Sequence, residues 1–280
     1  MAMKRRFIAP PRGEVDPSRF AHPLYAQYAA FADWMQGADW PGIDALNAAM
    51  PLQGRRFASQ DRSLLADGLH YEARIGERGL IATRAQNWHD LFNAMVWCRW
   101  PALKLAFNAR QRGHIDEMGP SRRNRAQYAL TQFDEAGVIV RVRDPSLMRP
   151  WDAHDWPALF HDHAAAWANG DIAMVAIVGH ALLEHGLLPA QFIVGKALVV
   201  QGEVDDAMCV ERIAQGIGTG ELLNDPLELR PLPLAGVPGW FGGQDAAFYR
   251  EAACFQPLRQ GRTYPPPMRI TPARDSARRG

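Results

Sequence analysis

Residues 122–142, RRNRAQYALTQFDEAGVIVRV, change from a helical pattern to a strand pattern at a single glycine. From Arg122 to Ala136 the apolar residues recur at helical spacing, which predicts an amphipathic helix. Gly137 is typical of a helix C-terminal cap. The run Val138–Val142 then predicts a strand that stops before Asp144-Pro145. A helix followed at once by a strand indicates an α+β fold.

The patterns outside this stretch are mainly helical. We expect further helices over 22–35, 41–50, 87–100, 101–111, 156–169 and 204–217, and a buried strand over 196–200. No internal repeat or long linker divides the chain. We therefore predict one mainly helical α+β domain over 21–262 with a small β-hairpin or sheet and an irregular C-terminal segment. An irregular arm would occupy 1–20, and a disordered tail 263–280.

Two segments have patterns that matter for the candidate sites. Residues 71–75 alternate between apolar and polar side chains, 76–79 are typical of a turn, and 80–82 are apolar. This order predicts a β-hairpin. Asp171 is in position to cap a long apolar helix over Ile172–Leu187.

The composition is that of a globular protein without an excess of either charge. Of 280 residues 48% are hydrophobic, and 31 Lys+Arg against 30 Asp+Glu give a formal net charge of +1. This balance supplies no strong field that would attract nucleic acid or an anionic membrane. The three cysteines lie far apart and lack zinc-type spacing, which favours reduced thiols and a cytoplasmic location. No apolar segment follows the basic N-terminus, so we expect no secretion signal.

The most apolar segment, Ile172–Val200, does not resemble a membrane span. It contains Glu184 and two histidines, and Gly186 and Pro189 interrupt it. A carboxylate near the centre of a bilayer is costly. We expect a buried core segment here.

The first candidate site is the sequence NWHDLFN at residues 87–93. His89 and Asn93 are four residues apart, so they share one face of a helix that is otherwise apolar on nearly every side. An unpaired buried polar group costs on the order of 1–3 kcal/mol, so these side chains need partners. Either they belong to a pocket, or Asn87 and Asp90 cap the helix while His89 and Asn93 bind loop backbone.

The second candidate site is the sequence GHALLEH at residues 179–185. His180 and Glu184 are again four residues apart on an apolar segment, a spacing that can present an imidazole and a carboxylate to one metal ion. The same spacing allows a His–Glu hydrogen bond that raises the basicity of the imidazole. The structural alternative is a self-satisfied pair that fixes helix packing.

Other chemical motifs are absent or weak. The sequence contains no HExxH, GxSxG, Walker or GxGxxG motif, and the glycines at 216–220 are better explained as a helix end than as a phosphate loop. Lys104 and Lys196 lie in apolar segments, where an ammonium group either reaches water or has a lowered pKa. The arginine-rich cluster at 122–125 lies at the start of a helix, where cations are disfavoured. Its charges are therefore either balanced by a nearby acid or bound anion, or exposed to solvent.

Several motifs in a fixed order resemble one known family. They are TRxxNWHDLFN (83–93) followed by Trp97, Pro101, Lys104 and Asn108; ALTQFDEAGV (129–138); GHALLE (179–184); PLP (231–233); GVPGW (236–240); Phe248-Tyr249; and Phe255-x-Pro257. Over roughly residues 20–260 the chain is similar to the bacterial family catalogued as domain of unknown function 3025. The resemblance implies one family-length unit of a mainly proteobacterial, cytoplasmic protein, and it implies no activity. Gly242–Asp245 departs from the asparagine-acid pair that the family pattern leads us to expect before Phe248.

The residues together predict one buried polar pocket. The candidate catalytic residues are His89, Asp90, His180 and Glu184; the candidate metal ligands are His89, His180 and Glu184; and the candidate substrate-binding residues are Arg84, Asn93, Lys104 and Asn108. Asp134 is a further candidate for supporting them. Hydrolysis is the favoured reaction, in which a divalent metal ion lowers the pKa of a bound water or His180, tuned by Glu184, acts as general base.

Two other functions remain open at this point. A non-catalytic binding or scaffold protein would use its buried polar residues structurally and its proline-rich segments to bind a partner. An anion-binding regulator would use Arg84 and Arg122–Arg125. The expected partner is an unidentified small molecule or protein, without a nucleic-acid signal or a membrane span. The distance between the His89 and His180 side chains discriminates best among these hypotheses.

Overall fold

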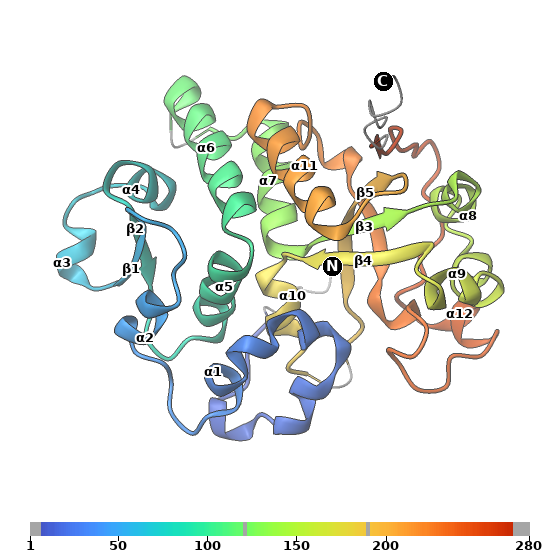
Figure 1. Cartoon of the computed structure of the whole chain (residues 1–280), viewed down its shortest axis with the longest axis horizontal. Coiled ribbons are helices and arrows are strands. Elements are labelled where there is room, and N and C mark those ends of the chain that lie inside the picture. The colour runs from blue at the N-terminus through green and yellow to red at the C-terminus, as the bar shows by residue number, and fades with distance from the viewer. Residues whose placement is uncertain (1–6, 120–121, 189–190, 271–280) are drawn as a thin grey trace, which may run out of the picture.

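A five-stranded mixed sheet forms the centre of the molecule in the computed structural model of the chain (Figure 1). The structure describes residues 7–119, 122–188 and 191–270. The strands are β4 (Ile172–Ile177), β3 (Gly137–Val142), β5 (Val194–Gln201), β6 (Arg230–Pro233) and β7 (Met268–Arg269). β3 lies between β4, to which it is antiparallel, and β5, to which it is parallel. β6 and β7 pair with opposite ends of β5, and all of β3 is buried.

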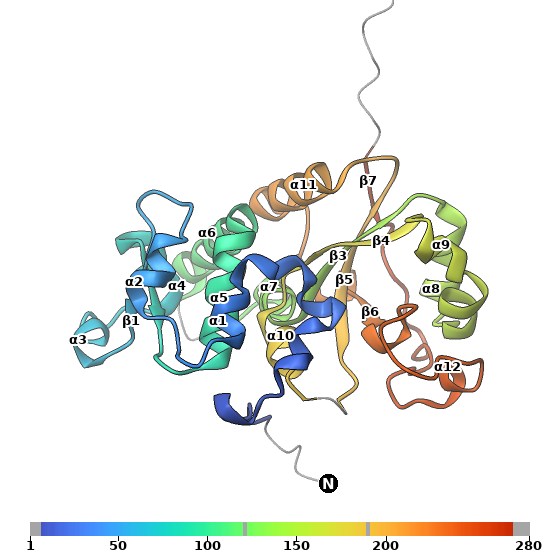
Figure 2. The ribbon, with the colours of Figure 1, turned by 60° about the horizontal axis from the view of Figure 1, so that its bottom comes forward.

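Helices flank this sheet, and they extend the molecule on both sides of it (Figures 1 and 2). The helices are α1 (Ala32–Gln36), α2 (Ile43–Ala48), α3 (Arg62–Leu65), α4 (Tyr71–Arg78), α5 (Trp88–Arg99), α6 (Pro101–Met118), α7 (Arg125–Ala136), α8 (Met148–Asp152), α9 (Ala164–Ala168), α10 (His180–His185), α11 (Asp206–Thr219) and α12 (Phe248–Glu251). α11 contacts β3 and β4, while α7 contacts β3 and β5. The fold is therefore α+β, as the sequence predicts.

The predicted change from helix to strand at residue 137 is confirmed, and the strand begins at the residue that follows the helix. Asn124 caps α7 through the backbone N–H of Gln127, whose side chain returns the interaction. Gly137 has an extended backbone, with φ of −71°, and is already the first residue of β3. Because no loop intervenes, the last residues of α7 are fixed relative to the sheet.

The predicted β-hairpin over residues 71–82 is wrong in its first half. Tyr71–Arg78 form α4, because Tyr71, Arg74 and Ile75 have helical spacing and the last two are buried. Gly79, with φ of 68°, adopts the left-handed conformation that ends the helix. Only residues 80–83 form a strand, β2, and it pairs in parallel with β1 (Arg56–Ser59). Parallel strands require such a crossover, which α4 supplies.

The predicted long helix over Ile172–Leu187 is also wrong. Ile172–Ile177 form β4, and a helix, α10, begins only at His180. The β-branched side chains of the segment favour a strand, and its pairing with β3 satisfies the backbone. His180 therefore follows directly after a sheet strand instead of lying in the middle of a helix.

Other predicted boundaries also differ. α6 continues to Met118, and β6 is a strand in a segment expected to be irregular. Met268–Arg269 pair with β5, so regular structure extends beyond the predicted domain end at residue 262, whereas residues 271–280 of the predicted tail lie outside the described residues. Within the ranges that the structure describes, no helix has both the length and the apolar character needed to cross a bilayer.

An ion pair anchors α4 at its base. The guanidinium of Arg74 donates to both oxygens of Asp67, at 3.0 and 2.7 Å, and both side chains are nearly inaccessible to solvent. The hydrogen bond from Arg74 lowers the pKa of Asp67 to about 2. The folded state therefore stabilises the charged form of the Asp67 carboxylate.

We expect this pair to contribute to stability in a pH-dependent way. The unfolded aspartate titrates near a pKa of about 3.9. The contribution should therefore be complete above that pH and should disappear as the pH falls through about 2. Chemical denaturation between pH 2 and pH 6 should show a shallower acid-side decline for Asp67→Asn than for the wild type. The exposed Asp44 of α2 provides the control, Asp44→Asn. Identical acid profiles for Asp67→Asn and the wild type would contradict this assignment.

Candidate functional site

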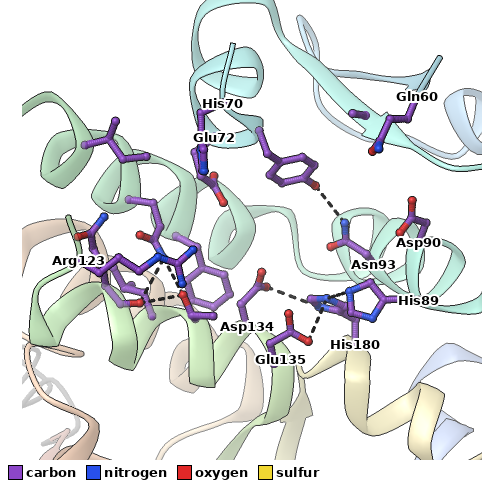
Figure 3. Close-up of a pocket in the computed structure, with 18 of the residues that line it drawn as sticks. Gln60, His70, Glu72, His89, Asp90, Asn93, Arg123, Asp134, Glu135 and His180 are labelled. Carbon is purple, nitrogen blue, oxygen red and sulfur yellow. Dashed lines mark hydrogen bonds and ion pairs between the residues drawn. The ribbon is translucent and has the colours of Figure 1, made fainter. Parts of the chain in front are cut away.

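A cavity of about 320 Å³ lies between α4, α5, α6, α7 and the start of α10. Figure 3 shows His89 and His180 at one end of it, with Asp134 and Glu135 pointing toward them from α7. His70 and Glu72 lie across the cavity. Polar side chains thus converge here from helices that are far apart in the sequence.

The two histidines meet through their Nε2 atoms. The distance from His89 Nε2 to His180 Nε2 is 3.0 Å, and the rings are nearly perpendicular, with an interplanar angle of 77°. His180 is 4% exposed, whereas the side chain of His89 is 29% exposed and reaches the cavity wall. The His89–His180 distance, which discriminates best among the hypotheses, is therefore short, and the two rings are in contact.

Each histidine has a carboxylate facing its other ring nitrogen. Nδ1 of His89 donates to Glu184 Oε2 at 3.0 Å. Nδ1 of His180 has no hydrogen-bond partner among the described residues, and Asp134 Oδ1 is 3.9 Å from it. The bond to Glu184 assigns the proton of neutral His89 to Nδ1, so its Nε2 accepts the hydrogen bond from His180 Nε2.

A third side chain, Glu135, completes the cluster. Its Oε2 lies 3.6 Å from His180 Nε2, and the ligand atoms of His89, Glu135 and His180 all lie within 4.8 Å of one another. With metal–ligand bonds of roughly 2.0–2.1 Å, two ligand atoms of a tetrahedral centre are about 3.4 Å apart. The separations of 3.0 and 3.6 Å bracket that value. The ligand atoms of His89 and Glu135 are farther apart, within 4.8 Å, so the cluster is compact enough for a candidate metal site without being an ideal tetrahedral set.

The pKa values of the two imidazoles are shifted in opposite directions. Burial lowers the pKa of His89, but the hydrogen bond that it donates to Glu184 and the charges of nearby carboxylates outweigh this effect, so its pKa is raised. Burial lowers the pKa of His180 to about 3. His180 is therefore neutral across the physiological range. Burial also raises the pKa of Glu135.

Lys104 and Asp134 form an ion pair behind the histidines. Lys104 Nζ donates to Asp134 Oδ1 at 2.6 Å, and the lysine is 3% exposed. Its ammonium group also lies over the ring of Trp97, 5.4 Å from the centroid. Lys104, expected to bind substrate, is thus occupied in holding Asp134 beside His180.

The other predicted substrate-binding residues have partners of their own. Arg84 binds both oxygens of Asp90, at 3.1 and 2.7 Å, so the carboxylate of Asp90 is engaged at the rim. Asn108 donates to the half-buried Glu72, and Asn93 donates to the Tyr71 hydroxyl at 3.0 Å. The Oδ1 of Asn93 has no partner among the described residues.

The helix-capping alternative holds for only one of these residues. Asn87 does cap α5, by accepting a hydrogen bond from the backbone N–H of Asp90. His89 and Asn93, in contrast, bind side chains instead of loop backbone.

The structure places one predicted metal ligand, Glu184, away from the other two. Glu184 contacts Nδ1 of His89, on the other side of that ring from the point where the Nε2 atoms meet. Glu135, which sequence reasoning missed, lies at that point instead. A signal existed: Asp134-Glu135 is an acidic pair in the last turn of a helix that leads directly into a buried strand.

Comparison with protein families bears on the same residues. The family model described as "Protein of unknown function (DUF3025)" matches residues 55–259. The chain belongs to this family. The DUF3025 match includes α4, α5, α7 and α10, and therefore every residue of the cluster. Searches of the curated proteins and of the solved structures found no match.

The position of His180 depends on a close contact between backbones. Within the region of the DUF3025 match, Gly179 packs so tightly on the end of α7 that a Cβ atom would lie 2.5 Å from Ala136 Cα and 2.7 Å from the Glu135 carbonyl oxygen. Real Cβ atoms do not approach backbone so closely. Glycine is therefore required for His180 to stand beside Glu135.

We expect Gly179→Ala to separate α10 from α7. Forcing a methyl group into this contact should lower the free energy of unfolding by about 1–3 kcal/mol. Denaturant titration measures the loss. The matched control is Gly218→Ala on α11, where a Cβ would meet no atom within 4 Å and helix propensity favours alanine. Equal stability of the two variants would show that the contact is looser than described.

Proposed function

We propose that this chain is a hydrolase that holds one divalent metal ion, of the zinc type, through His89 Nε2, His180 Nε2 and a Glu135 oxygen. One observation carries the proposal: these three ligand atoms converge within 4.8 Å on the wall of a cavity. Two imidazoles and one carboxylate are a ligand set of catalytic zinc sites, which keep a fourth position for water.

The groups around the ligands support this interpretation. In zinc sites, a ligating histidine usually donates its other N–H to a carboxylate or carbonyl, which fixes the ring and raises its basicity. Glu184 does this for His89, and Asp134 is the nearby carboxylate for His180. In the structure the two Nε2 atoms share a hydrogen bond of 3.0 Å, so a metal ion would replace the proton between them. A bound metal ion would lower the pKa of its water to about 7 and so supply a nucleophile at neutral pH.

The adjacent cavity wall offers groups for the substrate. Asn93 lies one helical turn after His89 and donates to the Tyr71 hydroxyl, which leaves the phenol proton available to donate. Burial raises the pKa of Tyr71, so this proton is retained. A hydrogen-bond donor on the wall of the same cavity is the type of group that stabilises an oxyanion. Asn93 Oδ1 is buried and has no partner among the described residues, so a substrate would reach it only after a rearrangement of this side chain.

A metal-free hydrolase is the second candidate, and one contact favours it. The Glu184–His89 hydrogen bond of 3.0 Å, which helps to raise the pKa of His89, is the arrangement of a general base held by a carboxylate. In this version His89 would take a proton from water, and Glu135 would act electrostatically. The two candidates differ in whether activity survives removal of metal.

Metal binding and hydrolysis test the proposal together. Chelator-treated protein should bind one Zn²⁺ per chain in a competition titration with a chromophoric chelator. It should then hydrolyse one class among p-nitrophenyl carboxylic esters, phosphate monoesters and phosphate diesters. Glu135→Gln should weaken binding, whereas Glu211→Gln, at an exposed position of α11, should not. Activity that persists unchanged in the stripped protein would favour the general base. Absence of both binding and activity would leave the structural interpretation of the histidines.

A further inference from the structure

A second cavity, of about 530 Å³, lies on the far side of β5 from β3, among β5, β6, the 3₁₀ segment Pro226–Glu228 and residues 256–264. It shares no lining residue with the histidine pocket. Lys196, Arg259 and Arg262 line it, together with His154, Gln256 and Tyr264. We call it the basic pocket.

The cations of the basic pocket make no direct ion pair within the described part of the chain, although the charge of Asp225 acts on Arg262 from outside the lining. No carboxylate residue lines the pocket, and within the described ranges neither Lys196 nor Arg259 nor Arg262 forms an ion pair. Asp152, close to His154 in the sequence, is bound by Arg230 at 2.6 Å. Burial lowers the pKa of Lys196, and the charges of Arg262 and Arg259 lower it further. The three positive groups therefore repel one another across a partly desolvated space.

Contacts within the chain hold Arg262 and Tyr264 in place on the wall of the pocket, while Arg259 is exposed at its rim. Arg262 Nη2 donates to the carbonyl oxygen of Leu227 at 2.8 Å, and its guanidinium lies 4.3 Å from the centroid of the Tyr264 ring. Tyr264 is held in turn by His154, whose Nε2 is 2.7 Å from its hydroxyl. Gly261, with φ of 76°, forms the turn between Arg259 and Arg262.

We propose that the basic pocket binds the phosphoryl group of a small phosphorylated molecule. Two arginines and a lysine around one cavity match a dianion with several acceptor oxygens better than they match a single carboxylate. The cavity has the size of a small-molecule site, and leucine and proline side chains on its wall can contact the apolar part of the ligand. The near-zero net charge of the chain argues against a nucleic-acid backbone as the ligand.

The lysine content of the chain allows a direct test. Only Lys4, Lys104 and Lys196 are present, so reductive methylation with ¹³C-formaldehyde labels at most three side chains and the N-terminal amine while keeping their charge. Lys196→Arg identifies the resonance of Lys196 by its loss. Titration with inorganic phosphate should shift this resonance saturably, and sodium chloride at equal ionic strength should not.

Two arginine variants make the result specific. Arg259→Gln should weaken phosphate binding about tenfold, because it removes a charged hydrogen-bond donor. Arg56→Gln, at an exposed position of β1, should leave it unchanged. A shift that does not saturate, that chloride reproduces, or that Arg259→Gln does not weaken would overturn the proposal. The readout is independent of metal and of hydrolysis, so it stands or fails separately from the histidine site.

Discussion

Replacement of His180 by alanine is expected to abolish metal-dependent hydrolysis and to reduce metal affinity more than any other single change in the pocket. His180 is buried, and its Nε2 is 3.0 Å from His89 Nε2 and 3.6 Å from Glu135, so its loss removes the central ligand of the cluster. The effect on affinity should exceed the roughly 10–100-fold that loss of an outer hydrogen-bond partner causes. Competition titration with a chelator measures it.

A graded series separates this loss of a ligand from a loss of folding. Glu184→Gln removes only the charge behind His89, so we expect a decrease of about 10–100-fold in metal affinity or activity. His89→Asn removes a ligand from a side chain that is already 29% exposed, which the fold should tolerate better than a change at His180. The control is His161→Ala, because the side chain of His161 is half exposed. If His89→Asn keeps full affinity, the proposed ligand set is wrong, whatever the stability of the His180 variant.

Replacement of Lys104 by methionine should cause the largest loss of stability. It leaves the Asp134 carboxylate without its 2.6 Å partner next to a buried imidazole. Loss of one partner of a buried ion pair costs about 3–5 kcal/mol, and the 25% exposure of Asp134 places the expectation at the lower end. Urea denaturation at neutral pH measures the change.

A double-mutant cycle isolates the pair itself. In Lys104→Met/Asp134→Leu both charges are absent, so the double variant should recover much of the stability that Lys104→Met loses. The variant Asp225→Asn removes the carboxylate of an ion pair that is more exposed, and it should cost about 1 kcal/mol or less. If the effects of the two changes at Lys104 and Asp134 are additive, then the lysine does not hold the aspartate in place.

Local sequence signals predicted the parts of the fold that local interactions determine. Asn87 caps α5 as expected, and α7 passes directly into β3 at Gly137. The two wrong segments depend on distant partners. Residues 172–177 are apolar at every position, so their pattern does not distinguish a buried helix from a buried strand, and the pairing with β3 decides it. Residues 71–78 fit alternation and helical spacing equally well until the burial of Arg74 is known.

The candidate site could be predicted only in part, for a similar reason. His89 and His180 stood out because they are polar side chains in strongly apolar segments, and the structure brings their rings into contact. Glu135 did not stand out, because an acid on an amphipathic helix ordinarily faces water. Its position follows from the junction of α7 with β3 and from the tight contact at Gly179, and neither is visible in the spacing of residues.

The wide separation of the three proposed ligands along the chain has a consequence for protein synthesis. His89 and His180 are 91 residues apart, and Glu135 lies between them on another helix. A nascent polypeptide that has emerged only as far as β4 carries two of the three donors and lacks the third. Tight capture of a cation therefore requires α5, α7 and α10 to have docked on one another. Occupancy by metal would then report the completion of folding, and a partly translated or misfolded polypeptide would not sequester the ion.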